Sequence, residues 1–177
     1  MAQVDSNDDM LCVKSGEDWL GRNAGVPSEN VLFEDCEVRS GHGLTLGSEM
    51  SGGIRNVTYR NIFFNTAASS TNADPRDPGP PKPGFYPGGA HFKTQRGRGG
   101  YLIDITYDNL HGAGVAAAIS FSCMHGAGPP ANATATPILR NITVKNMHLT
   151  GVHGDGFGAA SLADTGLSRA DRALSCA

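Results

Sequence analysis

The sequence has little charge, few aromatic side chains and no long apolar run, and each shortage excludes a class of protein. Only 18% of the 177 residues are charged and 12 are aromatic, which excludes a coiled coil rich in Ala, Glu, Lys and Leu. No apolar stretch approaches the ~18 residues of a membrane span. The net charge of −3 offers no basic field for nucleic acid. We therefore predict no nucleic-acid partner and no membrane partner.

The four cysteines form no CxxC pair, so the sequence predicts neither a zinc site nor a dense disulfide framework. We expect Cys12 and Cys36 to be buried in strands. The opening residues MAQVDSNDDM lack the basic and apolar regions of a signal peptide. Glycine is abundant, at 24 residues, and the 39% hydrophobic content argues against disorder over most of the length.

One short pattern occurs four times. It consists of Asn or Asp, then Val or Ile, any residue, an aromatic residue or Val, any residue, and Asp or Asn. Apolar side chains at every second position indicate strands with one buried face. The starts are 26, 48 and 37 residues apart, and we interpret the 48 as two turns of about 24 with an intervening strand near His91, Phe92 and Lys93. The four segments cover residues 30–36, 56–62, 104–110 and 141–147.

Short strands at this interval, separated by Gly and Asn and without an amphipathic helix, predict an all-β parallel solenoid. Asparagines at equivalent bends would satisfy one another's amides along its axis. A β-sandwich would instead show strands every 8–12 residues and hairpin turns such as Asn-Gly, and Asn-Gly does not occur. We therefore favour the solenoid over residues 1–151.

Two segments depart from the repeat. Residues 67–90 hold six of the ten prolines, and we predict a mobile, extruded insert there because proline cannot donate ladder hydrogen bonds. Residues 152–177 lose the strand pattern, and we expect an irregular tail with a weak helix near 167–174.

Several residues could carry chemistry. Asp8 and Asp9 directly precede a strand-like run, and two close carboxylates resist joint ionisation, which suits a general acid beside a general base. His42 lies between two glycines, where a tight bend would leave the imidazole open to a ligand. Lys93 and Arg96 belong to a cationic segment in an otherwise acidic chain, and such a segment can bind substrate carboxylates.

These motifs, in this order, resemble those of the polygalacturonases, glycoside hydrolase family 28. The similar stretches are Asn-Asp-Asp at 7–9 with Val-Lys-Ser-Gly at 13–16, Gly-His-Gly at 41–43 with Gly-Ser-Glu-Met-Ser-Gly-Gly at 47–53, and Phe-Lys-Thr at 92–94 with Arg-Gly-Arg-Gly-Gly at 96–100. The resemblance runs from about Val4 to Gly151. It implies a right-handed parallel β-helix and inverting hydrolysis of α-1,4-galacturonosyl bonds in pectin, without metal or cofactor.

The resemblance also implies site residues and a setting. Asp8 would protonate the glycosidic oxygen, Asp9 would help a second aspartate to activate water, and His42 would tune the acid. Lys93 would bind a substrate carboxylate, with His91 and Arg96 as further substrate-binding residues. We expect a monomer that acts on acidic polysaccharide outside the cell or in the cell wall.

The sequence also departs from the family pattern. The remaining family aspartate should lie about one coil upstream of Asp8, so we expect an N-terminally truncated fragment with an incomplete solenoid end. His91 replaces an arginine, and a titratable imidazole thus replaces a permanent charge. Two alternatives stay open: a catalytically inactive solenoid that binds acidic polysaccharide, and elimination of pectate on a similar solenoid.

Overall fold

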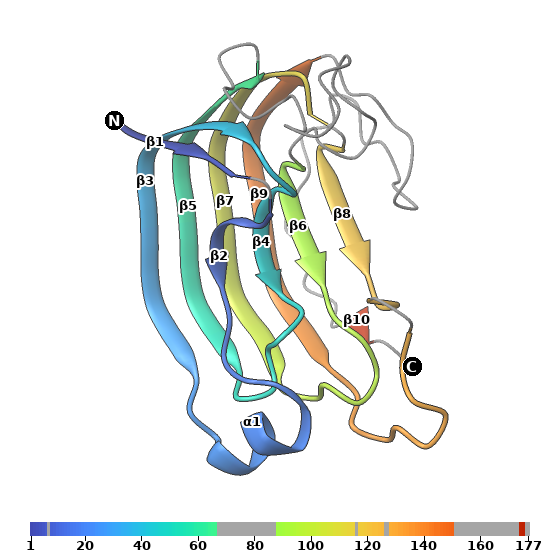
Figure 1. Cartoon of the computed structure of the whole chain (residues 1–177). Helices are drawn as coiled ribbons and strands as arrows, with labels where there is room; N and C mark the ends of the chain where they lie inside the picture. Colours follow the sequence, from blue (N-terminus) through green and yellow to red (C-terminus); the bar gives the residue numbers. More distant parts are fainter. Residues whose placement is uncertain (7, 67–87, 116, 126–127, 151–173, 176–177) are drawn as a thin grey trace.

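The chain forms a parallel β-helix whose two sheets enclose one core (Figure 1). The computed structural model describes residues 1–6, 8–66, 88–115, 117–125, 128–150 and 174–175. The first sheet has the order β1-β3-β5-β7-β9-β10 and the second the order β2-β4-β6-β8. Strand pairs are parallel except for β10, which is antiparallel to β9. The predicted solenoid is confirmed.

Each full coil contains one long strand and one short strand. The first sheet is built from β1 (Ala2–Asp5), β3 (Ser28–Ser40), β5 (Ile54–Asn65), β7 (Tyr101–Ala113), β9 (Ile138–Thr150) and β10 (Leu174–Ser175). The second is built from β2 (Met10–Val13), β4 (Leu44–Gly47), β6 (Ala90–Lys93) and β8 (Ile119–Ser122). Because the chain alternates between the sheets, equivalent turns of successive coils lie next to one another.

Similar side chains stack along the axis inside the core. The rings of Phe33 and Tyr59 are 5.0 Å apart, and those of Tyr59 and Tyr107 are 4.7 Å apart and nearly parallel. The buried Tyr59 hydroxyl donates to the Leu11 carbonyl at 2.7 Å, and that of Tyr107 donates to the Leu44 carbonyl at 3.2 Å. These bonds satisfy two phenols that burial would otherwise leave without a partner.

Each long strand of the repeat bends twice, at the two Asn or Asp positions of the sequence pattern. All eight residues have φ between 52° and 60°, a left-handed conformation that Asn and Asp adopt more readily than other residues with a side chain. Their side chains form ladders between coils. Asn56 donates to Asn30 at 2.7 Å, Asn61 donates to Asp35 at 2.9 Å, and Asn109 donates to Asn61 at 2.9 Å. The expected stacking of asparagines is therefore confirmed.

One interpretation of the repeat is wrong. The 48-residue interval is a single coil, because β5 pairs directly with β7 and Val57 lies opposite Ile105. The strand at Ala90–Lys93 belongs to the other sheet of that same coil. Sequence distance alone cannot distinguish an additional coil from a long insertion within one coil.

A short helix lies in a part of the sequence that shows no amphipathic helical pattern. It is α1 (Asp18–Ala24), which ends at Gly25 with a left-handed φ of 62°. Seven residues are too few for a clear helical period, so the pattern of the sequence did not indicate it. Among the described residues, no helix has the length and apolar character needed to cross a membrane.

The expectations for the two irregular segments fall largely outside the described residues. The proline-rich part at 67–87 and the tail at 151–173 and 176–177 belong there, as does Asn7. The described end of the insert is buried, and Ala90 already begins β6. Leu174 lies in β10, so the predicted helix does not include it.

The cysteines agree in part with the expectation of burial in strands. Cys36 is buried in β3, whereas Cys12 is only partly buried in β2, and both are free. Cys123 is disulfide-bonded.

We predict that the ladder contributes measurably to stability. Asn61→Ala removes two ladder bonds and places a Cβ-bearing residue without a local hydrogen bond in the left-handed region, so the free energy of unfolding should fall by about 2 kcal/mol. Asn61→Gly keeps the backbone conformation and should lose about half as much. Urea unfolding measures both variants. Equal losses would contradict the conformational part of the argument, and no loss in either would contradict the ladder.

Candidate active site

Two stacked turns bring the predicted acids and the histidine together. Asp8 and Asp9 lie in the turn between β1 and β2, and His42 lies in the equivalent turn of the next coil, between β3 and β4. The His42 amide donates to the Asp8 carbonyl at 3.0 Å, and the Met10 amide donates to the Gly43 carbonyl at 2.9 Å. These backbone bonds fix the register of the two turns. Residues that are 33 positions apart in the sequence, such as Met10 and Gly43, are therefore in direct contact.

The glycines beside His42 are required by this close stacking. A Cβ on Gly41 would lie 2.5 Å from the Asp8 carbonyl oxygen, and one on Gly43 would lie 2.7 Å from the Gly88 carbonyl oxygen of the following coil. Both glycines have φ above 120°, which residues with a side chain rarely adopt. The Gly-His-Gly motif therefore allows one turn to pack against its neighbours on both sides.

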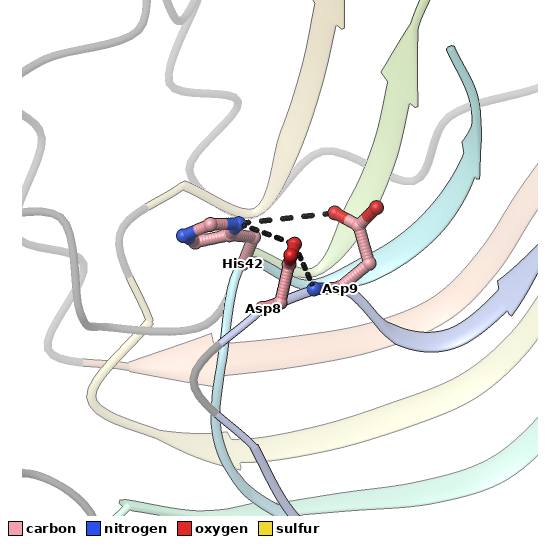
Figure 2. A group of neighbouring side chains, drawn as sticks. All are labelled: Asp8, Asp9 and His42. Atoms are coloured by element: carbon pink, nitrogen blue, oxygen red, sulfur yellow. Dashed lines mark hydrogen bonds and ion pairs between the residues drawn. The ribbon is translucent and has the colours of Figure 1, made fainter. Parts of the chain in front are cut away.

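Asp8, Asp9 and His42 form a compact cluster (Figure 2). The Nδ1 atom of His42 is 3.2 Å from Asp8 Oδ1 and 3.9 Å from Asp9 Oδ1. The Asp9 amide donates to Asp8 Oδ1 at 2.7 Å. The Asp8 side chain is 81% exposed and that of His42 is 44% exposed, whereas that of Asp9 is only 8% exposed. Two adjacent aspartates thus occupy different environments, one open to a ligand and one enclosed.

Asp9 is enclosed because Lys93 reaches it from β6. Lys93 Nζ lies 2.7 Å from both carboxylate oxygens of Asp9, and its side chain is 11% exposed. The Thr45 hydroxyl donates to Asp9 Oδ1 at 3.2 Å. Burial alone would raise the pKa of Asp9, but the hydrogen bond and charge of Lys93, with Lys14 and Thr45, lower it below its ordinary value. Asp9 is therefore a carboxylate at neutral pH.

His91 and Arg96 lie outside this cluster. His91 precedes Lys93 by two residues on β6, and its Nδ1 is 2.5 Å from the Ser120 hydroxyl on β8. Burial, assisted by the charge of Lys93, lowers the pKa of His91 to about 4, so the imidazole is neutral at pH 7. Arg96 lies in the turn after β6, and no hydrogen bond or ion pair of the described residues joins it to the cluster.

Reasoning from the sequence did not identify two further neighbours of Asp9, Lys14 and Cys12, or the contact of Lys14 with Glu49. Lys14 Nζ lies 3.5 Å from Asp9 Oδ2 and contacts Glu49, and the Cys12 thiol donates to Asp9 Oδ2 at 3.7 Å. Lys14 and Glu49 belong to two of the sequence motifs that carry the family resemblance, at 13–16 and 47–53. The ion pairs of Lys14 with Asp9 and with Glu49 depend on strand register, which the sequence does not state.

The cluster has the donor types that a cation prefers. One ligand atom from each of Asp8, Asp9 and His42 lies within 4.8 Å of the others. Carboxylate oxygens and an imidazole nitrogen are common ligands of divalent metals. One of the Asp9 oxygens, however, already contacts Lys93, Thr45 and His42. That the site works without a metal stays a prediction.

Comparison with known proteins gives a consistent result. No protein-family model matches the chain. The crystal structure of a hyperthermoactive exopolygalacturonase from Thermotoga maritima superimposes with a TM-score of 0.69 and 32% identity, over 85% of this chain and 30% of that one. The predicted right-handed parallel β-helix is therefore confirmed.

Curated sequences agree with this likeness. A polygalacturonase of Ralstonia solanacearum is 26% identical over 77% of this chain, and a probable polygalacturonase of Vitis vinifera is 33% identical over 56%. A polygalacturonase of Phaedon cochleariae is 29% identical over 84%. The chain spans 17% to 36% of the length of these relatives. It is thus similar to polygalacturonases in both sequence and fold.

We predict that Lys93 is structurally coupled to Asp9. Lys93→Met leaves a buried carboxylate with weaker compensation, so the free energy of unfolding at pH 7 should fall by about 3 kcal/mol. Urea unfolding measures this loss, and Asp9→Asn combined with Lys93→Met should recover part of it. Lys145→Met, which breaks the exposed pair with Asp108, is the matched control and should cost under about 1 kcal/mol. Equal losses in both single variants would contradict the prediction.

His91 should make stability depend on pH. Because its pKa falls from 6.5 to about 4 on folding, the unfolded chain binds a proton between these values that the folded chain excludes. The free energy of unfolding should therefore decrease from pH 6.5 to about pH 4, by up to about 3 kcal/mol. Asp9, whose pKa is also lowered, loses its contribution only at lower pH.

Urea unfolding at several pH values tests this dependence. His91→Gln should flatten the curve between pH 6.5 and 4, whereas His148→Gln, at an exposed position on β9, should not. A wild-type curve without a decline in this range would show that His91 is protonated in the folded protein.

Proposed function

We propose that this polygalacturonase-like chain carries the catalytic coils of a glycoside hydrolase that cleaves α-1,4-galacturonosyl bonds of pectin by single-displacement, inverting hydrolysis. The observation that carries the proposal is the convergence of Asp8, Asp9 and His42 from consecutive coils, with Lys93 bound to Asp9. The relatives named polygalacturonase support the same chemistry.

Exposure and contacts suit Asp8 to the role of general acid. Its side chain is the open member of the cluster and can approach a glycosidic oxygen without displacing a protein group. His42 Nδ1 contacts the same carboxyl group at 3.2 Å and can hold it in position. Proton donation to the leaving oxygen then begins cleavage of the glycosidic bond.

Asp9 suits the activation of water, although not alone. It is ionised and held in place, as a general base requires. Inverting hydrolysis needs carboxyl groups about 6.5–9.5 Å apart on opposite sides of the scissile bond. Asp8 and Asp9 are consecutive residues with ligand atoms within 4.8 Å, so a further carboxylate is needed to complete the pair. The family resemblance places that aspartate upstream of Asp8.

An acidic polysaccharide fits the charges near the cluster. Lys93 and Lys14 place two ammonium groups beside Asp9, where they can also attract a uronate carboxylate. We propose polygalacturonate as the partner, a monomeric protein, and an extracellular or cell-wall setting. The proposed role of Lys93 in substrate binding then competes with its contact with Asp9.

A second candidate is a solenoid that binds acidic polysaccharide without cleaving it. The neutral His91, in place of a charged arginine, favours this alternative, because it removes one cation from the substrate side of the site. The need for an additional carboxylate favours it as well.

A reducing-sugar assay on polygalacturonate separates the two candidates. We expect the wild-type chain to release reducing ends and Asp8→Asn to lower the rate at least about 100-fold, the usual contribution of general acid catalysis. Asp108→Asn, a control on β7 outside the cluster, should keep the wild-type rate. Proton NMR of the first product should show inversion at the anomeric carbon.

Three outcomes would overturn the hydrolase proposal. Binding of polygalacturonate without release of reducing ends would select the inactive solenoid. An unsaturated product that absorbs in the ultraviolet and disappears with chelator would select elimination. Equal rates for the wild type and Asp8→Asn would remove Asp8 from the chemistry.

A further inference from the structure

Asp9 contacts a second ammonium group besides Lys93. Lys14 follows β2 directly, and its Nζ lies 3.5 Å from Asp9 Oδ2 and 3.2 Å from the Gly47 carbonyl oxygen. The same ammonium contacts the Glu49 carboxylate, which comes from the turn after β4. Asp9, Lys14 and Glu49 therefore form a chain of alternating charge that joins two consecutive coils.

The two ammonium groups differ in burial. Lys93 is enclosed, whereas the Lys14 side chain is 42% exposed and that of Glu49 is 31% exposed. Lys93 contacts both oxygens of Asp9, while Lys14 approaches Oδ2 only. Lys14 thus approaches Asp9 from the more exposed side, and it contacts the carboxylates of both Asp9 and Glu49.

We infer that Lys14 and Glu49 are positioning residues that keep Asp9 the charged member of the Asp8–Asp9 pair. This inference rests on the proposed function, because it assigns the donated proton to Asp8. Two adjacent carboxyl groups without other partners would compete for one proton. Two cations beside Asp9 remove this competition, and the exposed Asp8 then delivers the proton.

Other groups around Asp9 also affect its titration. From β2 it is approached by the Cys12 thiol, whose pKa burial raises to about 11, so this group stays neutral. From β4 and its preceding turn it is approached by Thr45 and His42. From β6 it is approached by Lys93, with His91 on the same strand held neutral by burial. None of these groups balances the charge of Lys14 as Glu49 does.

The experiment measures the titration of Asp9 by carbon-13 NMR of its carboxyl carbon. Lys14→Met should raise the midpoint by up to about one pH unit, the low end for loss of a neighbouring opposite charge, because Lys14 is partly exposed. Glu49→Gln should move the midpoint in the opposite direction, since Asp9 is then the one carboxylate that pairs with Lys14 among the described residues. Lys14→Arg keeps the positive charge, so its midpoint should differ from the wild-type midpoint by no more than about half of the shift seen in Lys14→Met.

Lys145→Met is the matched control, because Lys145 is an exposed lysine paired with Asp108 on the first sheet. It should leave the Asp9 midpoint unchanged. An unchanged midpoint in Lys14→Met, or equal shifts of the same sign in Lys14→Met and Glu49→Gln, would overturn the inference. Preserved dispersion of the amide spectrum confirms that each variant is folded.

Activity provides the second readout. The acid limb of the kcat/KM profile on polygalacturonate should shift upward in Lys14→Met by the same amount as the Asp9 midpoint. A wild-type chain without activity would overturn the proposed function, while the NMR shifts would still decide the electrostatic role of Lys14. Shifts in NMR with an unchanged acid limb would overturn the assignment of Asp9 to the catalytic step.

Discussion

The stacking of the long strands depends on the left-handed bends at paired Asn and Asp positions. Each long strand changes direction at two such residues, five positions apart, and the side chains bond to the coils above and below. Because all four long strands of the repeat bend at the same two points, the coils have one shape and stack in register. A different bend in one coil would misalign the core aromatics and the turns that carry the acidic cluster.

The cluster is a product of this register. Asp8 and His42 are far apart in sequence but meet because their turns are equivalent in adjacent coils, and glycines on both sides of His42 allow backbones to approach closely. Lys93 comes from a third coil and reaches over the second to Asp9. Three coils are therefore sufficient to enclose one carboxylate and expose another, and the difference in environment gives two aspartates with separate chemical character.

Much of this arrangement could be predicted from the sequence, because strands, bends and motifs depend on residues that are close together in the chain. Alternating apolar residues indicated the strands, and the ordered motifs indicated that Asp8, Asp9 and His42 belong to one site. Partners that depend on register could not be predicted: the contact of Lys93 with Asp9, the bond between His91 and Ser120, and the charge chain through Lys14. The 48-residue interval does not reveal its cause, because an insertion within one coil lengthens the spacing of the strands just as an additional coil would.

That same interval has a wider consequence. The coil that contains it pairs with its neighbours as regularly as the 26-residue coil does, from Ile54 opposite Leu102 to Asn65 opposite Ala113. Connections between strands can thus change length while the scaffold keeps its geometry. Such connections can therefore vary in evolution without a change in the paired strands. A protein engineer could insert foreign peptides at the same place and keep the β-helix intact.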